Sequence, residues 1–406
     1  MKPNDSGIFK RVARPETGLS PRWTPGDPVD ARPGTGDHLP TGWALGGCPL
    51  LRPLSSCGGD VPVNASVDNA VLAADVGGTN LNLALLTPEG GRYRLLRKAR
   101  FSTQEERSLL GPIQRFLASD PSLRPGRACL SGAGPVLDRR IHLTNAPWDI
   151  DGAGLERALG IPVHLVNDFT ALSCGVLQLD LGDARQVTAL PHGDGRLPAA
   201  DPRGLSLVVG AGTGLGVGFV VPTPHGPRAF PSEGGHIGLP VFDEDTLALW
   251  RHLQAGLPGP PGAEMAVSGP GLALLFRFLL DSQRVPWTPV ASTLLALPAT
   301  DQPTAIAAQA ASDPACGRAM AMFVDLYARV CAELCAVFLP TGGIFLAGGI
   351  ASKNAPRFLE GGRFMARFER NYRAHLDQLT GATPVYLVHD YDLSLYGAAH
   401  APDCTP

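Results

Sequence analysis

Residues 71–86 read Val71-Leu-Ala-Ala-Asp75-Val-Gly-Gly-Thr-Asn80-Leu-Asn-Leu-Ala-Leu-Leu86, which is two apolar runs joined by a glycine-rich turn. Each run has the length and apolar character of a buried strand, and the short link between them predicts a hairpin. Two glycines at the tip remove Cβ atoms and leave main-chain N–H groups open to an anion. An ordinary hairpin turn accounts for the same residues, so this stretch alone leaves both interpretations open.

A second strand–turn–strand unit follows at 205–221, where Gly210-Ala-Gly-Thr-Gly-Leu-Gly216 separates two apolar runs. No Lys stands in the arrangement of a P-loop, and a strand rather than a helix follows the glycines, which argues against a Rossmann fingerprint. Two such turns, one from each unit, can hold a chain of phosphates from two sides. They also suggest that the architecture is duplicated.

A third glycine pair, Gly348-Gly349, follows an expected strand at 343–347. Small residues there let a planar ring lie against the backbone, although this motif by itself is better explained as an ordinary strand-to-loop turn. Asp75 places a carboxylate beside the first turn, where it can hold Mg²⁺ directly or through water.

Strands alternate with helices over the rest of the chain, which predicts the α/β class. A length of 406 residues exceeds one compact core and predicts two domains. We expect a small α/β domain at 70–178 plus 387–402 and a large α/β domain at 179–386. Further strands are expected at 93–101, 127–131, 140–144, 162–166 and 384–389, and helices at 104–118, 167–177, 245–254, 271–281, 305–311, 316–339, 363–379 and 393–399.

Residues 1–69 differ in composition, because ten Pro and ten Gly account for 20 of them and apolar periodicity is absent. Such a segment buries too little apolar surface to offset the entropy of ordering. We interpret it as a disordered extension or, equally, as residues added by a start codon placed too far upstream. Its acidic residues disfavour a transit peptide.

Charge and hydropathy exclude several classes of function. The formal net charge of -3 provides no basic face for nucleic acid. No apolar stretch is long enough to cross a bilayer, and we expect no membrane partner. The eight cysteines are scattered without a CxxC pair, which fits a reducing cytoplasm. Cys331 and Cys335 have the spacing of core residues on one helix face rather than of a disulfide.

Asn167 and Asp168 stand where an expected strand at 162–166 runs into a helix. In isolation this pair is a helix N-cap signature. The same position also lets a carboxylate face a cleft, where it can accept the proton of a hydroxyl group. His236 alone is best explained as a structural residue, because no second ligand stands at metal-binding spacing from it.

Taken together, the motifs resemble those of the bacterial glucokinase family, which consists of hexokinase-type sugar kinases of the actin and Hsp70 superfamily. The two glycine turns match its phosphate motifs, and Ala347-Gly-Gly-Ile350 matches its adenosine motif. Four further segments match in order and spacing, namely Leu143-Thr-Asn-Ala-Pro-Trp148, Val166-Asn-Asp-Phe-Thr-Ala171, Glu233-Gly-Gly-His-Ile237 and Val267-Ser-Gly-Pro-Gly-Leu272. The resemblance, which covers residues 70–402, implies a two-domain ribonuclease H-like (actin-like ATPase) fold with a cleft between the domains.

The resemblance implies transfer of the γ-phosphoryl group of ATP, with Mg²⁺, to the 6-hydroxyl of glucose, which is the first step of glycolysis. It makes Asp168 the catalytic base. It assigns the sugar to Asn167, Asp168, Glu233, His236 and Glu264. It assigns ATP to Ala74, Asp75, Val76, Gly77, Gly78 and Thr79 in the first motif, to Gly212, Thr213 and Gly214 in the second, and to Gly348 and Gly349 in the third. A homodimer is expected on the same ground.

One departure from the family pattern is Asn82, which stands where the family usually has Arg. The lost charge weakens the contacts to a triphosphate or leaves them to other groups. This substitution and the unusual first 69 residues keep open a catalytically weak sugar sensor. A kinase for mannose, fructose or an N-acetylhexosamine is also open, because a fold does not distinguish these sugars.

Overall fold

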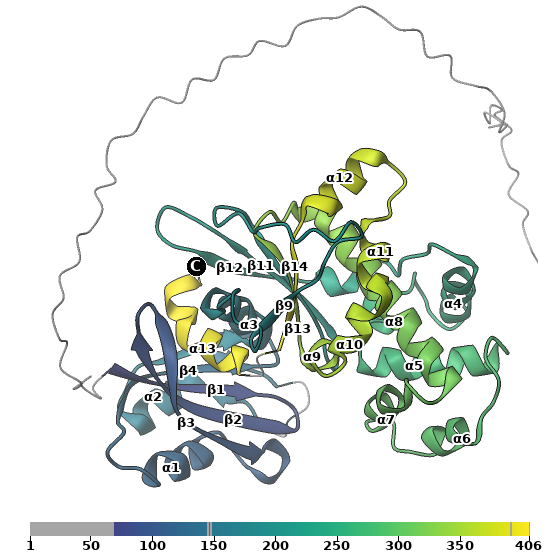
Figure 1. The fold of residues 1–406 in the computed structure, drawn as a ribbon. Coiled ribbons are helices and arrows are strands. Elements are labelled where there is room, and N and C mark those ends of the chain that lie inside the picture. The colour runs from purple at the N-terminus through teal and green to yellow at the C-terminus, as the bar shows by residue number, and fades with distance from the viewer. Residues whose placement is uncertain (1–68, 144–145, 147, 390–391, 406) are drawn as a thin grey trace, which may run out of the picture. The chain divides into compact units, whose positions relative to one another are not determined.

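The computed structural model describes residues 69–143, 146, 148–389 and 392–405. The chain divides into units of residues 1–62 and 63–406, and only the second contains described residues. The predicted extension over 1–69 lies, apart from Asn69, outside the described residues. Figure 1 shows the helices and strands of the second unit.

A five-stranded sheet carries the first glycine turn. Its order is β3-β2-β1-β4-β8, formed by Arg92–Ser102, Asn80–Glu89, Ala70–Val76, Pro125–Gly132 and Val163–Asn167. β1 pairs antiparallel with β2, in a register that sets Asp75 opposite Asn82, and parallel with β4. The hairpin predicted at 71–86 is confirmed.

A six-stranded sheet repeats this arrangement around the second glycine turn. Its order is β12-β11-β10-β13-β14-β9, formed by Arg228–Ser232, Leu215–Val221, Ser206–Ala211, Gly343–Ala347, Val385–Val388 and Val187–Ala189. β10 pairs antiparallel with β11 and parallel with β13, as β1 does with β2 and β4. The α/β class and the duplicated architecture are therefore confirmed.

A third, small sheet lies between β4 and β8 in the chain. Its order is β5-β6-β7, formed by Val136–Leu137, Arg140–Ile141 and Ile150–Asp151. The strand predicted at 140–144 is too long, because only Arg140 and Ile141 pair. A tight turn precedes them, in which Asp138 and Arg139 both adopt positive φ.

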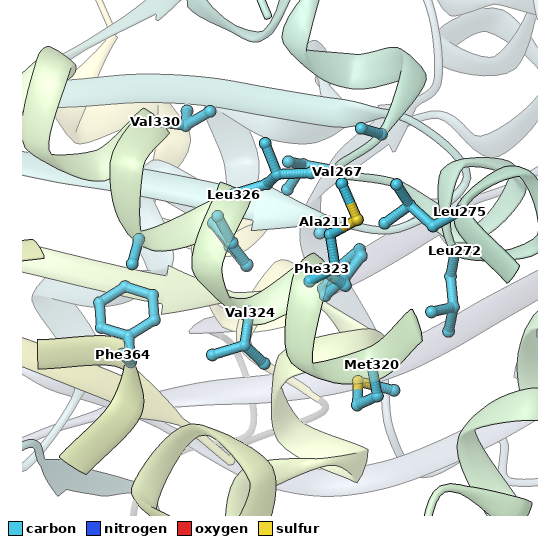
Figure 2. Close-up of a cluster of buried hydrophobic side chains, with 14 of the residues drawn as sticks. Ala211, Val267, Leu272, Leu275, Met320, Phe323, Val324, Leu326, Val330 and Phe364 are labelled. Atoms are coloured by element: carbon cyan, nitrogen blue, oxygen red, sulfur yellow. The ribbon is translucent and has the colours of Figure 1, made fainter. Parts of the chain in front are cut away.

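Most of the predicted helices are present, and the longest packs on the six-stranded sheet. The described α-helices are α1 Leu110–Ala118, α2 Gly152–Leu159, α3 Asp168–Gly175, α4 Glu244–Gln254, α5 Gly269–Asp281, α6 Pro289–Leu295, α7 Gln302–Gln309, α8 Pro314–Phe338, α9 Gly349–Lys353, α10 Ala355–Leu359, α11 Arg363–Glu369, α12 Ala374–Ala382 and α13 Leu393–Cys404. Figure 2 shows Phe323 and Leu326 of α8 among buried side chains that include Ala211 of β10 and Leu275 of α5. This cluster is the main core of the residues around the larger sheet.

The helix predicted at 104–118 begins later than expected. A 3₁₀ turn occupies Thr103–Glu105, and α1 begins only at Leu110. Pro112 explains the delay, since a proline has no N–H and is tolerated only in the first turn of a helix.

The helix predicted at 363–379 is interrupted between α11 and α12. Asn371 lies at the break, where its N–H bonds Asp377 Oδ1 at 2.8 Å and its side-chain amide donates to Glu369 O at 3.0 Å. These local bonds replace those of a continuous helix, as polar side chains often do in turns. The elements α2, α6, α9, α10, β9 and β12 were not expected, and each has at most eight residues.

The cysteines are only partly as expected. Cys331 and Cys335 are buried and unpaired, which confirms their place in the core of α8. A disulfide joins Cys174 of α3 to Cys404 of α13, and a separation of 230 residues hid this pairing from the sequence. Within the described ranges, no helix combines the length and the apolar character needed to span a membrane.

Candidate active site

A cavity of about 230 Å³ lies where the ends of several strands and helices meet. It is reached by the end of β1, the first turn of α3, the start of α9 and the start of α13. Its lining consists of Asp75, Asp168, Phe169, Leu172, Gly348, Gly349, Ser352, Val388, Leu393 and Ser394. The predicted base, the predicted metal ligand and the third glycine pair therefore line one cavity.

Asp75 is held in this cavity by hydroxyl groups from two other elements. Ser394 Oγ at the start of α13 donates to Asp75 Oδ2 at 2.9 Å, and Ser131 Oγ of β4 approaches Oδ1 at 3.5 Å. Burial raises the pKa of Asp75, whereas bonds from Ser394, Ser131 and Asn82 partly oppose that rise. The hydroxyl groups thus fix the carboxyl group in position, whereas burial disfavours its ionised form.

Asp168 is the first residue of α3, and the capping role falls to its neighbour. Asn167 Oδ1 accepts from Phe169 N at 2.9 Å and from Thr170 N at 3.1 Å, which makes Asn167 the N-cap. Asn167 Nδ2 donates to Asp168 Oδ1 at 3.0 Å and to Gly134 O at 3.2 Å. The capping interpretation therefore applies to Asn167 and leaves a carboxyl oxygen of Asp168 to face the cavity.

The pKa of Asp168 is raised to about 6. The main cause is burial, and the second is the nearby charge of Asp75. Bonds from Phe169 N–H and from Asn167 lower the pKa and offset part of this rise. A carboxyl group with a pKa close to the working pH is suited to accept a proton.

Phe169, the next residue, anchors α3 on the second hairpin. Its ring occupies the space that side chains at Gly210 and Gly216 would fill. The glycines of β10 and β11 therefore have a packing role, since a Cβ at Gly216 would overlap the ring. This contact places the start of α3, and with it Asp168, beside the hairpin of β10 and β11 that carries the second glycine turn.

The first glycine turn is braced by the segment after β3. Gly77 N donates to Asn80 O at 2.9 Å within the turn, and Thr103 Oγ1 donates to Gly77 O at 2.8 Å. Gln104 Nε2 donates to Gly78 O at 2.6 Å. Ala74 and Val76 are buried strand residues that place this turn, while Thr79 is exposed.

The second glycine turn is braced by backbone and by Glu264. Gly212 O accepts from Gly269 N at 2.7 Å, which ties the turn to the start of α5. Glu264 Oε2 accepts from Leu215 N at 2.9 Å. Thr213 at the tip is exposed, and Gly214 packs against the Glu264 carboxylate.

The third pair contains the glycine with the strictest backbone requirement. Gly348 has φ +90°, and a Cβ added there would lie 2.8 Å from Ala211 O. Only glycine adopts this conformation without strain in so close a contact. Gly349 begins α9, and nothing lies within 4 Å of the position that its Cβ would take.

Of the five predicted sugar ligands, Asp168 lines the cavity, and Asn167, Glu233, His236 and Glu264 do not. Glu233 directly follows β12, its side chain is 93% exposed, and its Oε2 is 3.7 Å from His236 Nε2. His236 is exposed as well. The two residues lie near Glu264, because Ala263 N donates to Ile237 O at 2.7 Å. The structure thus brings Asp168 to the cavity, with Asn167 bonded to it from outside the lining. It leaves Glu233 and His236 in solvent and Glu264 at the second glycine turn.

The cavity's carboxyl groups suit a divalent cation. The negative charge of Asp75 raises the pKa of Asp168, and a cation held by Asp75 would reduce that effect. Among the described residues, no three His, Cys, Asp or Glu side chains gather at metal-binding distances. A magnesium ion would therefore complete its shell with water and phosphate oxygens, as this ion commonly does.

Ser394, Ser131 and Asn82 are site residues that sequence reasoning missed or took for a loss. Asn82 lies opposite Asp75 across the hairpin and hydrogen-bonds it. The predicted hairpin could have indicated this neighbour, because residues that lie opposite each other in an antiparallel strand pair have adjacent side chains. No signal in the sequence pointed to Ser394, which is 319 residues from Asp75.

Known proteins with similar sequences and structures agree on one family. The Glucokinase family model matches residues 72–404. A glucokinase of Cupriavidus pinatubonensis is 34% identical over 337 residues, which cover 81% of this chain and 91% of that protein. The crystal structure of a glucokinase from an Antarctic psychrotroph has a TM-score of 0.68 and 28% identity, and the alignment covers 82% of this chain and 98% of that one.

A more distant structure shares the fold. It is a ROK family glucokinase from Streptomyces griseus in complex with glucose and AMPPNP, with a TM-score of 0.53 and 20% identity. The alignment covers 82% of this chain and 98% of that one. The expected actin-like ATPase fold is confirmed by these neighbours.

Proposed function

The chain belongs to the glucokinase family, and from this premise we propose that it transfers the γ-phosphoryl group of ATP to the 6-hydroxyl of glucose with Asp168 as the base. The observation that carries the assignment is the shared cavity of Asp168, Asp75 and the Gly348-Gly349 pair. A hydroxyl becomes a competent nucleophile when its proton can leave.

Asp168 accepts that proton as the oxygen attacks. With a pKa of about 6 the group is mostly ionised at pH 7, yet it is basic enough to hold the proton during transfer. The bonds from Asn167 and from Phe169 N–H keep the carboxylate in one orientation. The rest of the rate enhancement comes from positioning and from stabilisation of phosphoryl charge.

The nucleotide lies with its phosphates against the glycine turns. At Gly212 and Gly349 the Cβ positions face open space, so a ligand can approach the main chain there. A cavity of about 230 Å³ is smaller than a typical site for a whole organic ligand and fits the reacting phosphoryl group. Backbone N–H groups and the exposed hydroxyls of Thr79 and Thr213 are the donors for the remaining phosphate oxygens.

Mg²⁺ bound beside Asp75 would neutralise part of the phosphate charge. Asp75 holds the ion directly or through water, and Ser394 and Asn82 keep its carboxylate in place. Asn82, which stands in the position of the family's usual Arg, contributes through Asp75 rather than by a charge of its own. This arrangement supports an active enzyme rather than a weak sensor.

The sugar is recognised by side chains of two neighbouring segments, the turn after β12 and the 3₁₀ turn Ala263–Met265. Sugar hydroxyls are donors, and Glu233 and Glu264 supply oxygen acceptors, while His236 can donate or accept. Asn167 acts by positioning Asp168, because its Oδ1 already accepts from Phe169 N and Thr170 N. One carboxylate oxygen of Glu264 already accepts a hydrogen bond from Leu215 N, so the side chain is oriented before the sugar binds. Glu233 is exposed and would be ordered by the sugar.

Two domains, 70–178 plus 387–402 and 179–386, are proposed to close on the sugar. The chain leaves the six-stranded sheet after β14 and returns through α13, where Ser394 bonds Asp75 of β1. Closure would exclude water, which otherwise competes for the phosphoryl group. Small-angle scattering with and without glucose tests this proposal, and an unchanged radius of gyration would contradict it.

A coupled assay on the full chain tests the function. We expect phosphorylation of glucose with ATP to exceed that of mannose, fructose and N-acetylglucosamine, and to exceed the rate with polyphosphate. Asp168→Ala should remove the activity, whereas Asp281→Asn, at an exposed site at the end of α5, should leave it unchanged. Activity that survives Asp168→Ala would overturn the assignment of the base.

The setting of the reaction is part of the same proposal. The cytoplasmic location stays a prediction, and the Cys174–Cys404 disulfide removes the cysteine pattern as support for it. Fractionation of cells that express the chain tests it. The homodimer stays a prediction, which sedimentation equilibrium of the purified protein checks.

A further inference from the structure

A second and larger cavity lies among α7, α8, α10 and α11. Its volume is about 660 Å³, within the range of roughly 300–1,000 Å³ that small-molecule sites occupy. It is formed by the end of α7, the first half of α8 and the segment from α10 to the end of α11. Its lining consists of Ala310, Gly317, Met320, Ala321, Val324, Asp325, Arg357, Glu360, Gly361, Arg363, Ala366, Arg367 and Arg370.

This cavity shares no lining residue with the one at Asp168. Its charged residues are four arginines against Asp325 and Glu360, a formal excess of two positive charges. Small residues of α7, α8 and α11 leave the space between them open. The chemistry of the lining is therefore cationic, and no aromatic side chain takes part in it.

The carboxylates neutralise only part of this charge, even with Asp243 outside the lining, whose Oδ2 is 3.9 Å from an Arg367 nitrogen. Asp325 is buried and accepts from Arg363 at 2.9 Å, while Arg367 lies farther away at 3.8 Å. Glu360 pairs with Arg357 at 2.8 Å. For the exposed Arg370 guanidinium, no ion pair occurs with any residue in the described part of the chain.

The excess charge is concentrated on one helix. Arg363 and Arg367 are one turn apart on α11, and Arg370 is the extended residue that directly follows this helix. Like charges at this spacing repel each other. The pKa of Arg329, which bonds Arg370 O, is lowered by burial, and the charge of Arg367 adds to that effect. A bound anion would offset the positive charge that the neighbouring carboxylates leave unneutralised.

We propose that this cavity binds a small phosphorylated metabolite, a phosphate monoester such as a hexose phosphate, through Arg357, Arg367 and Arg370. A guanidinium group matches a phosphate in geometry and can donate two parallel hydrogen bonds to it. The volume exceeds that of inorganic phosphate and leaves space for a sugar beside Met320 and Val324, whose side chains Figure 2 shows on α8. Binding here would be independent of catalysis at Asp168.

Calorimetric titration of the full-length protein, with the active site filled by glucose and AMPPNP, tests this inference. We expect one further equivalent of glucose 6-phosphate to bind, and glucose alone to give no additional heat. Binding of glucose 6-phosphate at least tenfold tighter than inorganic phosphate is expected if the sugar contacts the cavity. Equal affinities would overturn the sugar part of the proposal and identify phosphate as the whole ligand.

Two variants assign the heat to this cavity. Arg370→Gln and Arg357→Gln each remove a guanidinium group without exposing the buried Asp325, and each should weaken binding at least tenfold. Arg277→Gln removes an exposed charge of α5 that lines neither cavity and should leave binding unchanged. Thermal melting of each variant verifies its fold. Absence of binding to the filled enzyme, or unchanged binding to both cavity variants, would overturn the proposal.

Discussion

The fold places two predicted sugar ligands in opposite environments. These residues are Asp168, at the start of α3, and Glu233, after β12. Asp168 is largely buried, is bonded by Asn167 and by Phe169 N–H, and has a pKa raised to about 6. Glu233 has 93% of its side chain in solvent, and its near charged neighbour is the exposed His236.

The difference separates reaction from recognition. A group that must accept a proton is useful only if its orientation and basicity are set in advance, and the fold fixes both at Asp168. A group that only recognises a hydroxyl can be ordered by the sugar itself, at an entropic cost included in the binding free energy. The four predictions that follow test this contrast.

The largest effect is expected for Asp168→Asn. Loss of the base should lower kcat by about 10²- to 10⁴-fold. The folded state should become more stable at pH 7, because the variant no longer buries an ionised group with a raised pKa. A rise in pKa from 3.8 to about 6 sets an upper limit of roughly 3 kcal/mol on that gain. Urea denaturation and steady-state kinetics on the same preparation measure both effects.

The exposed Asp281 provides the control for this variant. Asp281→Asn should change neither kcat nor the free energy of unfolding. An Asp168→Asn enzyme that is less stable than the parent would show that the hydrogen bonds to the carboxylate outweigh its burial. The contrast between the buried and the exposed acid would then be wrong.

Glu233→Gln should have the second largest effect, and on binding rather than on chemistry. A hydrogen bond from a neutral donor to a carboxylate is stronger than one to an amide, so KM for glucose should rise about ten- to a hundredfold. kcat should fall little, and stability should not change, because the side chain is exposed in the absence of sugar. A fall in kcat without a change in KM would place Glu233 in the chemical step.

The pH dependence of the unmodified enzyme should reflect the buried group. Asp168 must be ionised to accept a proton, so kcat/KM should fall as the pH drops through about 6, by roughly tenfold at pH 5. The contribution of Asp168 to the free energy of unfolding should change in the opposite sense and become more favourable to the folded state as the pH falls. The native state binds the proton more tightly than the unfolded chain does, so this group's destabilising effect grows as the pH rises from about 4 to 6. An activity profile that is flat between pH 5 and 7 would contradict the raised pKa.

The buried half of this site was partly predictable because its signals are local in sequence. Asp75 and the first glycine pair are adjacent in the chain, and Asn167-Asp168 marks a strand that enters a helix. Strand and helix periodicity also predicted both hairpins and the long α8. These features depend on neighbouring residues, which a single sequence displays directly.

The rest of the site depends on tertiary packing. Ser394 reaches Asp75 only because α13 packs beside β1, and Phe169 explains the glycines of β11 only once α3 lies across that strand. The exposure of Glu233 and the raised pKa of Asp168 depend on which atoms surround them, which motifs do not specify. The disulfide between Cys174 and Cys404 was hidden for the same reason.

The smallest effect is expected for Ser394→Ala, which probes how far the buried site relies on its neighbours. The hydroxyl donates to Asp75 Oδ2 at 2.9 Å and lowers the pKa of that carboxyl. Its loss should raise the pKa of Asp75 further, weaken the hold on Mg²⁺ and raise the KM for Mg–ATP by a few-fold, about 1 kcal/mol. Ser131→Ala is the matched control, since Ser131 Oγ is 3.5 Å from Asp75 and bonds Ala74 O at 3.0 Å, and its effect on KM should be smaller. Equal KM values for Ser394→Ala and the parent enzyme would show that the fold positions Asp75 without α13, and the preorganisation inferred for the buried group would then reside in β1 alone.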